Sequence, residues 1–307
     1  MMEKPVSVTE GLRYPRPKLA GIPKYMNVLW RSFNKKNIML TLGIIFATFI
    51  ILVAIFAPVL EPYDPTKMDL ALKFIPPSAA HIFGTDNMGR DVLSRIIEGS
   101  RISLSTAFMV VIFSACIGTL VGMISGFWGG KVDMIFMRIV DVLLAFPTII
   151  FALAISTVLG TGAINLVIAI CCIQWTSYAR VSRGEAILLK NAEYIEAAKA
   201  IGNNSLQIMF KYFLPNIVSK ILILASLNIG SIILYCASLS FLGLGAQPPS
   251  PDWGAMISDG KEYMRYAPWM AIFPGLAIAA SALTFNMLGD GVRDLLDPRM
   301  RDSVKTE

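Results

Sequence analysis

The sequence predicts an all-α membrane protein with six transmembrane helices, and three observations support this fold class. Of the 307 residues, 55% are hydrophobic and only 16% are charged, and the mean hydropathy is +0.62. A soluble globular domain carries about 25% charged residues. The few charges are also unevenly placed and leave five long uncharged stretches. This composition excludes disordered, collagen-like and disulfide-framework proteins, and it indicates a polytopic membrane protein.

The five uncharged stretches predict where the transmembrane helices lie, because a helix needs about 20 mostly apolar residues to cross the hydrocarbon core. Four stretches hold one helix each. The third is long enough for two, and Gly160-Thr161-Gly162 near its middle supplies a turn between them. The stretches are 37–60, 102–130, 142–179, 221–251 and 266–289.

The basic residues predict the orientation of these helices. With the N-terminus inside, 20 of the 27 Lys and Arg residues lie on the cytoplasmic side and seven lie outside. Basic residues near helix ends favour the cytoplasm, so we expect both termini there, in a cell membrane. The first hydrophobic run follows a long basic segment and lacks a small-residue cleavage site, so it is interpreted as a retained helix and not as a signal peptide.

This topology divides the chain into five segments. They are a cytoplasmic N-terminal tail (1–36), the first transmembrane helix (37–60), an extracytoplasmic loop with an amphipathic interfacial helix (61–101), a core with five transmembrane helices and a cytoplasmic loop at 180–220 (102–289), and a cytoplasmic C-terminal tail (290–307).

No motif for nucleotide or metal chemistry is present in the sequence. There is no G-x-x-x-x-G-K-[ST] and no H-E-x-x-H, so we expect no P-loop and no zinc-protease site. The one histidine, His81, cannot build a metal site alone and is interpreted as a polar loop residue. The four cysteines lie in apolar runs and are interpreted as small core residues. We therefore expect no cofactor and no metal on this chain.

Catalysis and nucleic-acid binding are not expected either. The net charge of +6 follows the membrane topology and is not a patch for nucleic acid. Arg138 and Asp141 are three residues apart and are interpreted as an ion pair near a helix end. Charged residues inside a membrane are candidate functional residues. These two lie near the cytoplasmic end of the predicted third helix, and no paired catalytic groups accompany them.

The cytoplasmic loop at 180–220 is too long for a simple connection, because loops beyond about 12–15 residues usually carry structure or function. It is predicted to hold two short helices. Asn191 would cap the first, at 192–201, in which Tyr194, Ala198 and Ile201 share a face. Ser205 would cap the second, which ends at Leu214-Pro215 and whose apolar stripe comprises Leu206, Met209, Phe210 and Phe213. Such helices either dock into a partner's groove or fold back on their own bundle.

The amino-acid sequence of this loop favours docking into a partner. Glu196-Ala197-Ala198, then Gly202, then Leu214-Pro215 resembles the EAA loop of the permeases of ABC importers (E-A-A-x3-G-x9-I-x-L-P). The isoleucine of that pattern is replaced here by Tyr212. The resemblance implies that the loop couples the permease to an ATPase subunit. It also implies that ATP and magnesium are bound by two partner ATPases and not by this chain.

Three further blocks narrow the resemblance to the oligopeptide/dipeptide/nickel permease subfamily. The segment between the first two helices and the C-terminal block resemble the second, C-type permease of the pair. The resemblance implies a type I importer permease fold, a homologous permease as partner and an extracytoplasmic substrate-binding protein. The blocks are Gly84-Thr85-Asp86 with Gly89-Arg90-Asp91, Ser94-Arg95, Gly99 and Arg101-Ile102-Ser103-Leu104; Ser240–Gly245 with Pro248-Pro249 and Trp253-Gly254; and Leu288–Gly291 with Arg293-Asp294 and Asp297-Pro298-Arg299.

Two of these blocks flank the outer surface. The first is predicted to form the amphipathic interfacial helix, with Asp91–Arg95 and Glu98–Arg101 pairs on its polar side; the alternative is a plain solvated loop helix. The second, rich in glycine and proline, is predicted to form a rigid turn. It either contacts the binding protein or braces the last two transmembrane helices.

Within the bundle, two helices carry regular patterns. Gly118, Gly122 and Gly126 follow Ser114 at every fourth position, which predicts close helix–helix packing. A polar face on the fifth helix is expected to look into the bundle, either lining the translocation pathway or making interhelical hydrogen bonds. It comprises Asn228, Ser231, Tyr235 and Ser238.

The favoured hypothesis is a permease subunit of an ATP-driven importer for dipeptides or oligopeptides. The alternative within the subfamily is an importer for nickel, a metal chelate or a metallophore. A channel or secondary transporter working alone would need charges or broken helices at the bilayer midplane. An intramembrane enzyme would need a catalytic set, which the sequence lacks.

Overall fold

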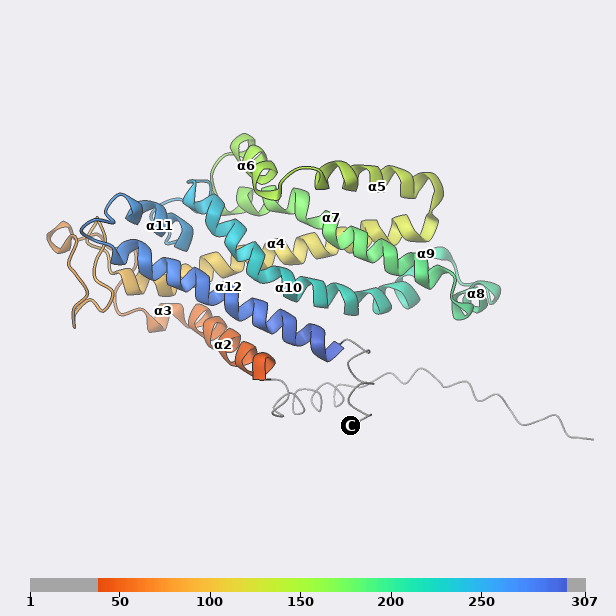
Figure 1. Ribbon diagram of the computed structural model, residues 1–307, viewed down its shortest axis with the longest axis horizontal. Helices are drawn as coiled ribbons and strands as arrows, with labels where there is room; N and C mark the ends of the chain where they lie inside the picture. The colour runs from red at the N-terminus through yellow and green to blue at the C-terminus, as the bar shows by residue number, and fades with distance from the viewer. Residues whose placement is uncertain (1–37, 297–307) are drawn as a thin grey trace, which may run out of the picture.

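The computed structural model describes residues 38–296, and it is almost entirely helical over this range (Figure 1). Five long helices run along the length of the molecule: α2 (Ile38–Ile55), α4 (Val92–Trp128), α7 (Ala163–Lys190), α10 (Leu214–Phe241) and α12 (Trp269–Leu296). The shorter elements are α3 (Ala57–Leu60), the 3₁₀ turn η1 (Leu70–Leu72), α5 (Gly130–Leu144), α6 (Thr148–Leu159), α8 (Glu193–Ala200), α9 (Ser205–Ile208), the π-helical turn η2 (Met209–Phe213) and α11 (Trp253–Lys261).

Five helices of the described range are long and apolar enough to cross a membrane, and the count reaches the predicted six if the bent pair α5 and α6 is taken as one span. Gly160 and Gly162 form the predicted turn before α7, both with positive φ. The predicted tail at 1–36 and most of the one at 290–307 lie outside the described residues.

The third span differs from the prediction, which placed one helix in the first half of the stretch 142–179, before the turn at Gly160-Thr161-Gly162. It is instead broken, with α5 and α6 meeting at 95°. The break falls at Ala145-Phe146-Pro147, and Pro147 stands at the N-cap of α6 in extended conformation. Proline has no N–H to bond the preceding turn and disfavours a helical residue before it, so the two halves separate here.

The helix predicted before the second transmembrane helix is present and is continuous with it. Residues 92–104 are the first turns of α4, which continues without a break to Trp128. Glu98 pairs with Arg101 at 3.2 Å as expected, but Asp91 does not pair with Arg95. Asp91 caps α4 and Arg95 lies near Asp86, all of them buried, because the loop before α4 folds over this end of the helix.

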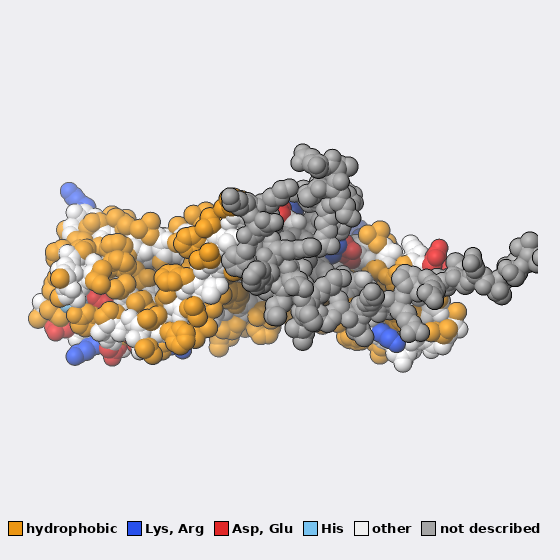
Figure 2. All heavy atoms as spheres, turned by 90° about the horizontal axis from the view of Figure 1, so that it is seen from below, with side chains coloured by type: hydrophobic (Ala, Val, Ile, Leu, Met, Phe, Trp, Pro, Cys, Tyr) orange, Lys and Arg blue, Asp and Glu red, His pale blue; other side chains and the backbone are white. Residues whose placement is uncertain are grey.

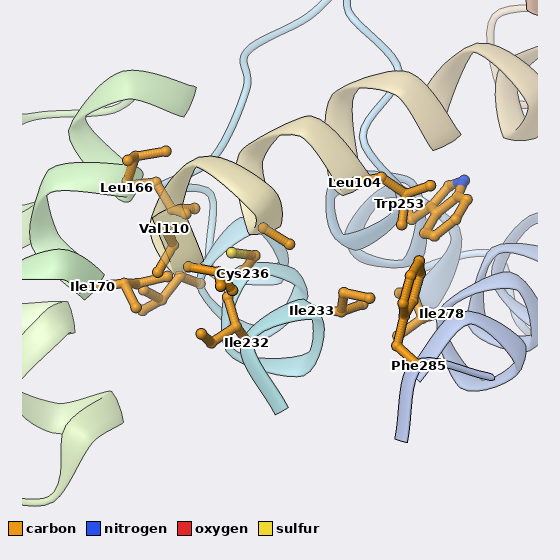
Figure 3. Close-up of a cluster of buried hydrophobic side chains, with 14 of the residues drawn as sticks. Leu104, Val110, Leu166, Ile170, Ile232, Ile233, Cys236, Trp253, Ile278 and Phe285 are labelled. Atoms are coloured by element: carbon orange, nitrogen blue, oxygen red, sulfur yellow. The ribbon is translucent and has the colours of Figure 1, made fainter. Parts of the chain in front are cut away.

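The bundle has two separate apolar cores. The larger joins α4, α7 and α10 to α2, α6, α11 and α12, and Figure 3 shows part of it, with Val110 beside Leu166 and Ile170, and Ile233 beside Phe285. The smaller lies at the end where α8 and α9 sit, and it joins them to α4, α7 and α10. The larger core extends toward the end at which α11 lies, and the smaller core lies at the end of α8 and α9.

Much of the remaining apolar surface is uncovered, as expected for a chain that faces lipid and other subunits. Hydrophobic side chains cover most of the coloured face in Figure 2. Large apolar residues such as Phe49, Val158 and Leu283 are more than 60% exposed. Cys116 is exposed as well, so the prediction that all four cysteines are core residues is wrong for that one.

Candidate functional site

The loop predicted to dock on a partner forms a compact segment at one end of the molecule (Figure 1). We refer to residues 191–213, which comprise α8, α9 and η2, as the 191–213 segment. It is shorter than the predicted loop at 180–220, because α7 extends to Lys190 and the helical run resumes at Ser205 and continues through α10. Both flanking transmembrane helices therefore enter it directly.

The helix caps in this segment differ from the predicted ones. The N-cap of α8 is Ala192, without a side-chain hydrogen bond, in place of Asn191. The N-cap of α9 is Asn204 in place of Ser205, since the Asn204 side chain accepts the Gln207 N–H while the Gln207 side chain accepts the Asn204 N–H. This reciprocal capping box fixes the start of α9.

Gly202 ends α8 in a Schellman motif. Its φ is +90°, its N–H donates to the Lys199 carbonyl at 3.0 Å, and the Asn203 N–H donates to the Ala198 carbonyl at 3.1 Å. No atom lies within 4 Å of the place a Cβ would occupy. Glycine is therefore required for its backbone conformation and not for close packing within this chain.

One side of the 191–213 segment is packed onto the adjacent ends of the long helices. Ile195 on α8 and Phe213 on η2 are fully buried with Met123 of α4. The same cluster includes Ala186, Ile208, Met209 and Ile217. The segment is thus fixed to α4, α7 and α10 by a continuous apolar contact, as the fold-back alternative predicts for this side.

The other side presents large apolar side chains to solvent. Tyr194, Ile201, Leu206 and Phe210 are 47%, 78%, 60% and 55% exposed. The predicted stripe on the second helix is therefore split, because Met209 is buried while Leu206 and Phe210 face outward. Glu196 and Ala197 are also exposed, whereas Ala198 is buried. The segment has one buried face and one exposed face that suits a partner's groove.

Pro215 does not end the second helix, contrary to the prediction. It lies in the first turn of α10, which follows η2 directly. A proline inside a helix removes one backbone hydrogen bond, and the π-helical turn before it changes the pairing of that stretch. The Asn216 side chain donates to the Tyr212 carbonyl at 2.6 Å. Tyr212, which replaces the isoleucine of the pattern, is half-buried against the smaller core.

The three glycines of the fourth-residue pattern lie where α4 crosses α7. A Cβ at Gly118 would stand 2.3 Å from the Trp175 carbonyl oxygen, and one at Gly122 would stand 2.1 Å from that of Ala179. A Cβ at Gly126 would meet the Ala186 methyl at 2.7 Å. The absence of side chains at these positions lets the two backbones approach closely.

The polar face predicted on α10 is divided between the bundle and its surface. Asn228 and Tyr235 are half-buried, and Tyr235 packs against the larger core, whereas Ser231 and Ser238 are exposed. The Ser238 hydroxyl donates to its own helix, at the Leu234 carbonyl (2.7 Å). The two serines lie open because the buried side of α10 is its apolar side, with Ile232, Ile233 and Cys236.

The pair predicted between Arg138 and Asp141 is not formed. Asp141 accepts a hydrogen bond from Arg180 of α7 at 2.9 Å instead. A second bridge between the same helices joins Asp133 and Arg183. Arg180 reaches this aspartate because α5 packs beside α7.

At the opposite end, tryptophans and buried charges hold the outer loops in place. The Trp253 indole N–H donates to the Ile96 carbonyl at 2.9 Å, and that of Trp269 donates to the Thr85 carbonyl at 3.0 Å. His81 is buried and lies 2.9 Å from the Asp91 carboxylate, so it is not a solvated loop residue. The sequence shows these residues but gives no signal of their partners, which are far away in the chain.

Asp252 shows the electrostatics of this end most clearly. It caps α11, accepting the Gly254 N–H at 2.8 Å and the Ser240 hydroxyl at 3.1 Å. Burial raises the pKa of its carboxyl above the ordinary value of 3.8, and the hydrogen bonds from Gly254 and Ser240 oppose this rise. The site therefore favours the neutral acid relative to water.

Among residues 38–296, no three His, Cys, Asp or Glu side chains lie close enough together to hold a metal ion. An apolar groove of about 660 Å³ lies between α4 and α7, lined by residues such as Met109, Phe113, Ile164 and Trp175. The polar face of α10 does not contribute to it.

Comparison with known proteins places this arrangement in a family. Residues 118–302 match the family described as the binding-protein-dependent transport system inner membrane component. The chain belongs to this family. Residues 24–77 match the N-terminal transmembrane domain of oligopeptide transport permease C. The chain is thus a C-type permease and a multi-pass membrane protein, and the family resemblance of the sequence is confirmed.

Full-length relatives agree with this assignment. The chain is 44% identical to the glutathione transport system permease protein GsiD of Pectobacterium atrosepticum, over 89% of this chain and 90% of that protein. It is 43% identical to the dipeptide transport system permease protein DppC of Alkalihalophilus pseudofirmus, over 87% and 88%. It is 42% identical to the probable D,D-dipeptide transport system permease protein DdpC of Escherichia coli, over 81% and 84%.

A solved structure supports the fold of this permease. A chain of the MetNI methionine ABC transporter, in inward-facing conformation, aligns with a TM-score of 0.53 at 18% identity. The alignment covers 66% of this permease and 96% of that chain. At this identity the likeness supports the fold alone, which is the importer permease fold expected from the sequence.

Proposed function

We propose that this permease is the membrane subunit of an ATP-driven importer for small peptides. The observation that carries the proposal is the 191–213 segment, whose buried face is joined to α4, α7 and α10 while its other face exposes Tyr194, Ile201, Leu206 and Phe210. A partner that moves this face moves three transmembrane helices. The printed names of the relatives, for glutathione and dipeptide transport, support a peptide substrate.

The proposed complex has five components around one pathway. A homologous permease packs beside this one, two ATPases bind ATP and magnesium on the cytoplasmic side, and an extracytoplasmic binding protein delivers the peptide. ATP binding on the partners displaces the 191–213 segment and biases a bundle with two stable arrangements. Asn228, Ser231, Tyr235 and Ser238, which are open or half-open on α10, line the pathway between the two permeases.

The test is transport by the complete complex in proteoliposomes. Dipeptides, longer peptides, glutathione and a nickel chelate are offered one at a time with the cognate binding protein. Peptide or glutathione uptake that requires both ATP and the binding protein supports the proposal. Uptake of the nickel chelate alone supports the metal-chelate alternative, and uptake by this permease without ATPases supports a transporter that works alone.

Coupling is tested separately with Glu196→Lys. The exposed carboxylate of Glu196 lies on the α8 face that we assign to the ATPase, so reversing its charge should lower the peptide transported per ATP while the complex still assembles. Glu193→Lys makes the same change one turn earlier, outside the matched motif, and serves as the control. Equal transport by both variants and the wild type contradicts the assignment.

A further inference from the structure

The helix α5 is held to the rest of the chain in an unusual way. Val140 is its only buried residue. No residue of α5 belongs to the apolar cluster that joins the 191–213 segment to α4, α7 and α10. Its apolar residues are instead largely exposed, with Met134 and Ile135 at 66% and 61%. Apolar packing within this chain therefore fixes α5 only weakly.

A charged bridge makes the attachment that packing does not. The Asp133 carboxylate accepts hydrogen bonds from Arg183 Nε at 2.5 Å and from a terminal guanidinium nitrogen at 2.7 Å. The Ser125 hydroxyl of α4 donates to the same carboxylate at 2.5 Å. Bidentate pairing of this kind fixes orientation as well as distance. One side chain of α5 thus joins α4 and α7.

The connection between α4 and α5 places little steric restraint on the direction of α5. The two helices are linked by Gly129 and Gly130, which have φ values of +68° and +53°. No atom lies within 4 Å of a Cβ placed at Gly130. Two glycines in such a conformation form a joint with little steric restraint. The Asp133–Arg183 bridge lies in the first turn beyond this joint and restricts the pivoting of α5.

Arg183 lies on α7, the helix that leads directly into the 191–213 segment. It is seven residues before Lys190, the end of α7, and α8 begins at Glu193. A helix rises 1.5 Å per residue, so the separation along α7 is roughly 10 Å. Since α7 is one continuous helix here, a displacement of the segment reaches Arg183 without an intervening break.

The helix that this bridge holds is half of the broken span. The break at 145–147 is exposed in this chain, as are Phe146 and Ile150 beside it. Backbone groups without partners cost several kcal/mol in hydrocarbon, so non-helical backbone at membrane depth is covered by protein or faces a water-filled cavity. The α5–α6 pair must therefore contact the second permease or the pathway.

We propose that the Asp133–Arg183 bridge is a positioning contact that transmits movement of the 191–213 segment to the α5–α6 broken span. The inference rests on the proposed function, since it needs a partner that displaces the segment. The neighbouring Asp141–Arg180 pair joins the same two helices, but its side chains are 60% and 57% exposed. Exposed pairs contribute little, so this pair serves as the matched control.

The first experiment tests the mechanical link without any substrate. Hydrogen exchange is measured on the complete complex in nanodiscs, for the wild type, Asp133→Asn and Asp141→Asn. Asp133→Asn should accelerate amide exchange in 131–144 and leave 205–221 unchanged, while Asp141→Asn should resemble the wild type. Unchanged exchange in 131–144, or an equal effect of both variants, overturns the proposal.

The second experiment tests transmission. In proteoliposomes, Asp133→Asn should lower the peptide transported per ATP several-fold, and Asp141→Asn should not. The charge-swapped double variant, Asp133→Arg with Arg183→Asp, should restore most of the peptide transported per ATP, and a variant that is merely destabilised would not recover it. Normal transport per ATP in Asp133→Asn, or no recovery in the charge-swapped variant, contradicts the role in coupling. Failure of the wild type to transport peptides rejects the proposed function. The hydrogen-exchange experiment still decides whether the Asp133–Arg183 bridge holds α5.

Discussion

Gly202 and Asp252 show how single residues set the geometry at the two ends of this permease. Gly202 closes α8 with a positive φ and completes the Schellman hydrogen bonds. Asp252 caps α11 with a buried carboxyl group. Neither role depends on apolar packing, and each one predicts the effect of a conservative substitution.

At Gly202, the predicted effect depends on backbone conformation. A left-handed residue with a Cβ costs roughly 1–2 kcal/mol, and asparagine tolerates this region better than other residues. Gly202→Val should therefore disturb the end of α8 and lower peptide transport per ATP, whereas Gly202→Asn should keep most of it. Both are measured in proteoliposomes with equal amounts of assembled complex. Equal loss in the two variants would point to contact with a partner as the reason for glycine.

At Asp252, the prediction concerns pH. Burial raises the pKa of this carboxyl above 3.8 in the folded protein, so the folded state binds the proton more tightly than the unfolded state does. The contribution of Asp252 to stability is complete below pH 3.8 and is lost as the pH rises through the higher folded pKa.

Asp252→Asn keeps an oxygen for the Gly254 N–H and has no charge to bury. The melting temperature of the variant complex relative to the wild type should therefore rise between pH 4 and pH 7. The quantity is the difference between the two melting temperatures, measured in detergent at each pH. A difference that falls over this range contradicts the role of burial.

Among the elements, the contact between α4 and α7 and the bend between α5 and α6 matter most. The spacing of Gly118, Gly122 and Gly126 predicts that another helix packs there but cannot show that it is α7. The break before α6 follows from Pro147, a residue visible in the sequence. The absence of charge over 142–179 hid it, because uncharged residues continue through the break.

The α4–α7 contact predicts opposite outcomes for two glycine substitutions. At Gly122 a Cβ would stand 2.1 Å from a backbone oxygen, so Gly122→Ala should destabilise the protein by about 1–3 kcal/mol, as overpacking usually does. At Gly184 on α7 no atom lies within 4 Å, and alanine is the better helix former by up to about 1 kcal/mol. Thermal unfolding of the purified complex should show a lower melting temperature for Gly122→Ala and an unchanged or higher one for Gly184→Ala. The same shift in both variants contradicts the close approach.

For the whole molecule, the two apolar cores hold different parts of the chain together. The larger core, with the loops held by Trp253 and Trp269, stabilises the end of the molecule at which α11 lies. The smaller core fixes the 191–213 segment to three long helices. The surfaces left open, on α5, α6 and α10, are those we assign to the second permease and the pathway.

The orientation of the whole chain is a separate prediction. The split of 20 to seven basic residues places both termini in the cytoplasm. Alkaline phosphatase fused after residue 307 should be inactive in cells, and a fluorescent protein there should fluoresce. Phosphatase inserted at residue 247, between α10 and α11, should be active. An active phosphatase at the C-terminus contradicts the topology.

By itself the sequence determined the fold class, the number of spans, the family and the position of the EAA motif. These follow from the placement of charged residues and from local sequence motifs, neither of which depends on contacts between distant residues. Only the tertiary structure decided that Met209 is buried while Leu206 is exposed, that the serines of the polar face of α10 are exposed, and that Asp133 meets Arg183. Each depends on which helices pack together, and residues 50 positions apart meet only through the arrangement of the bundle.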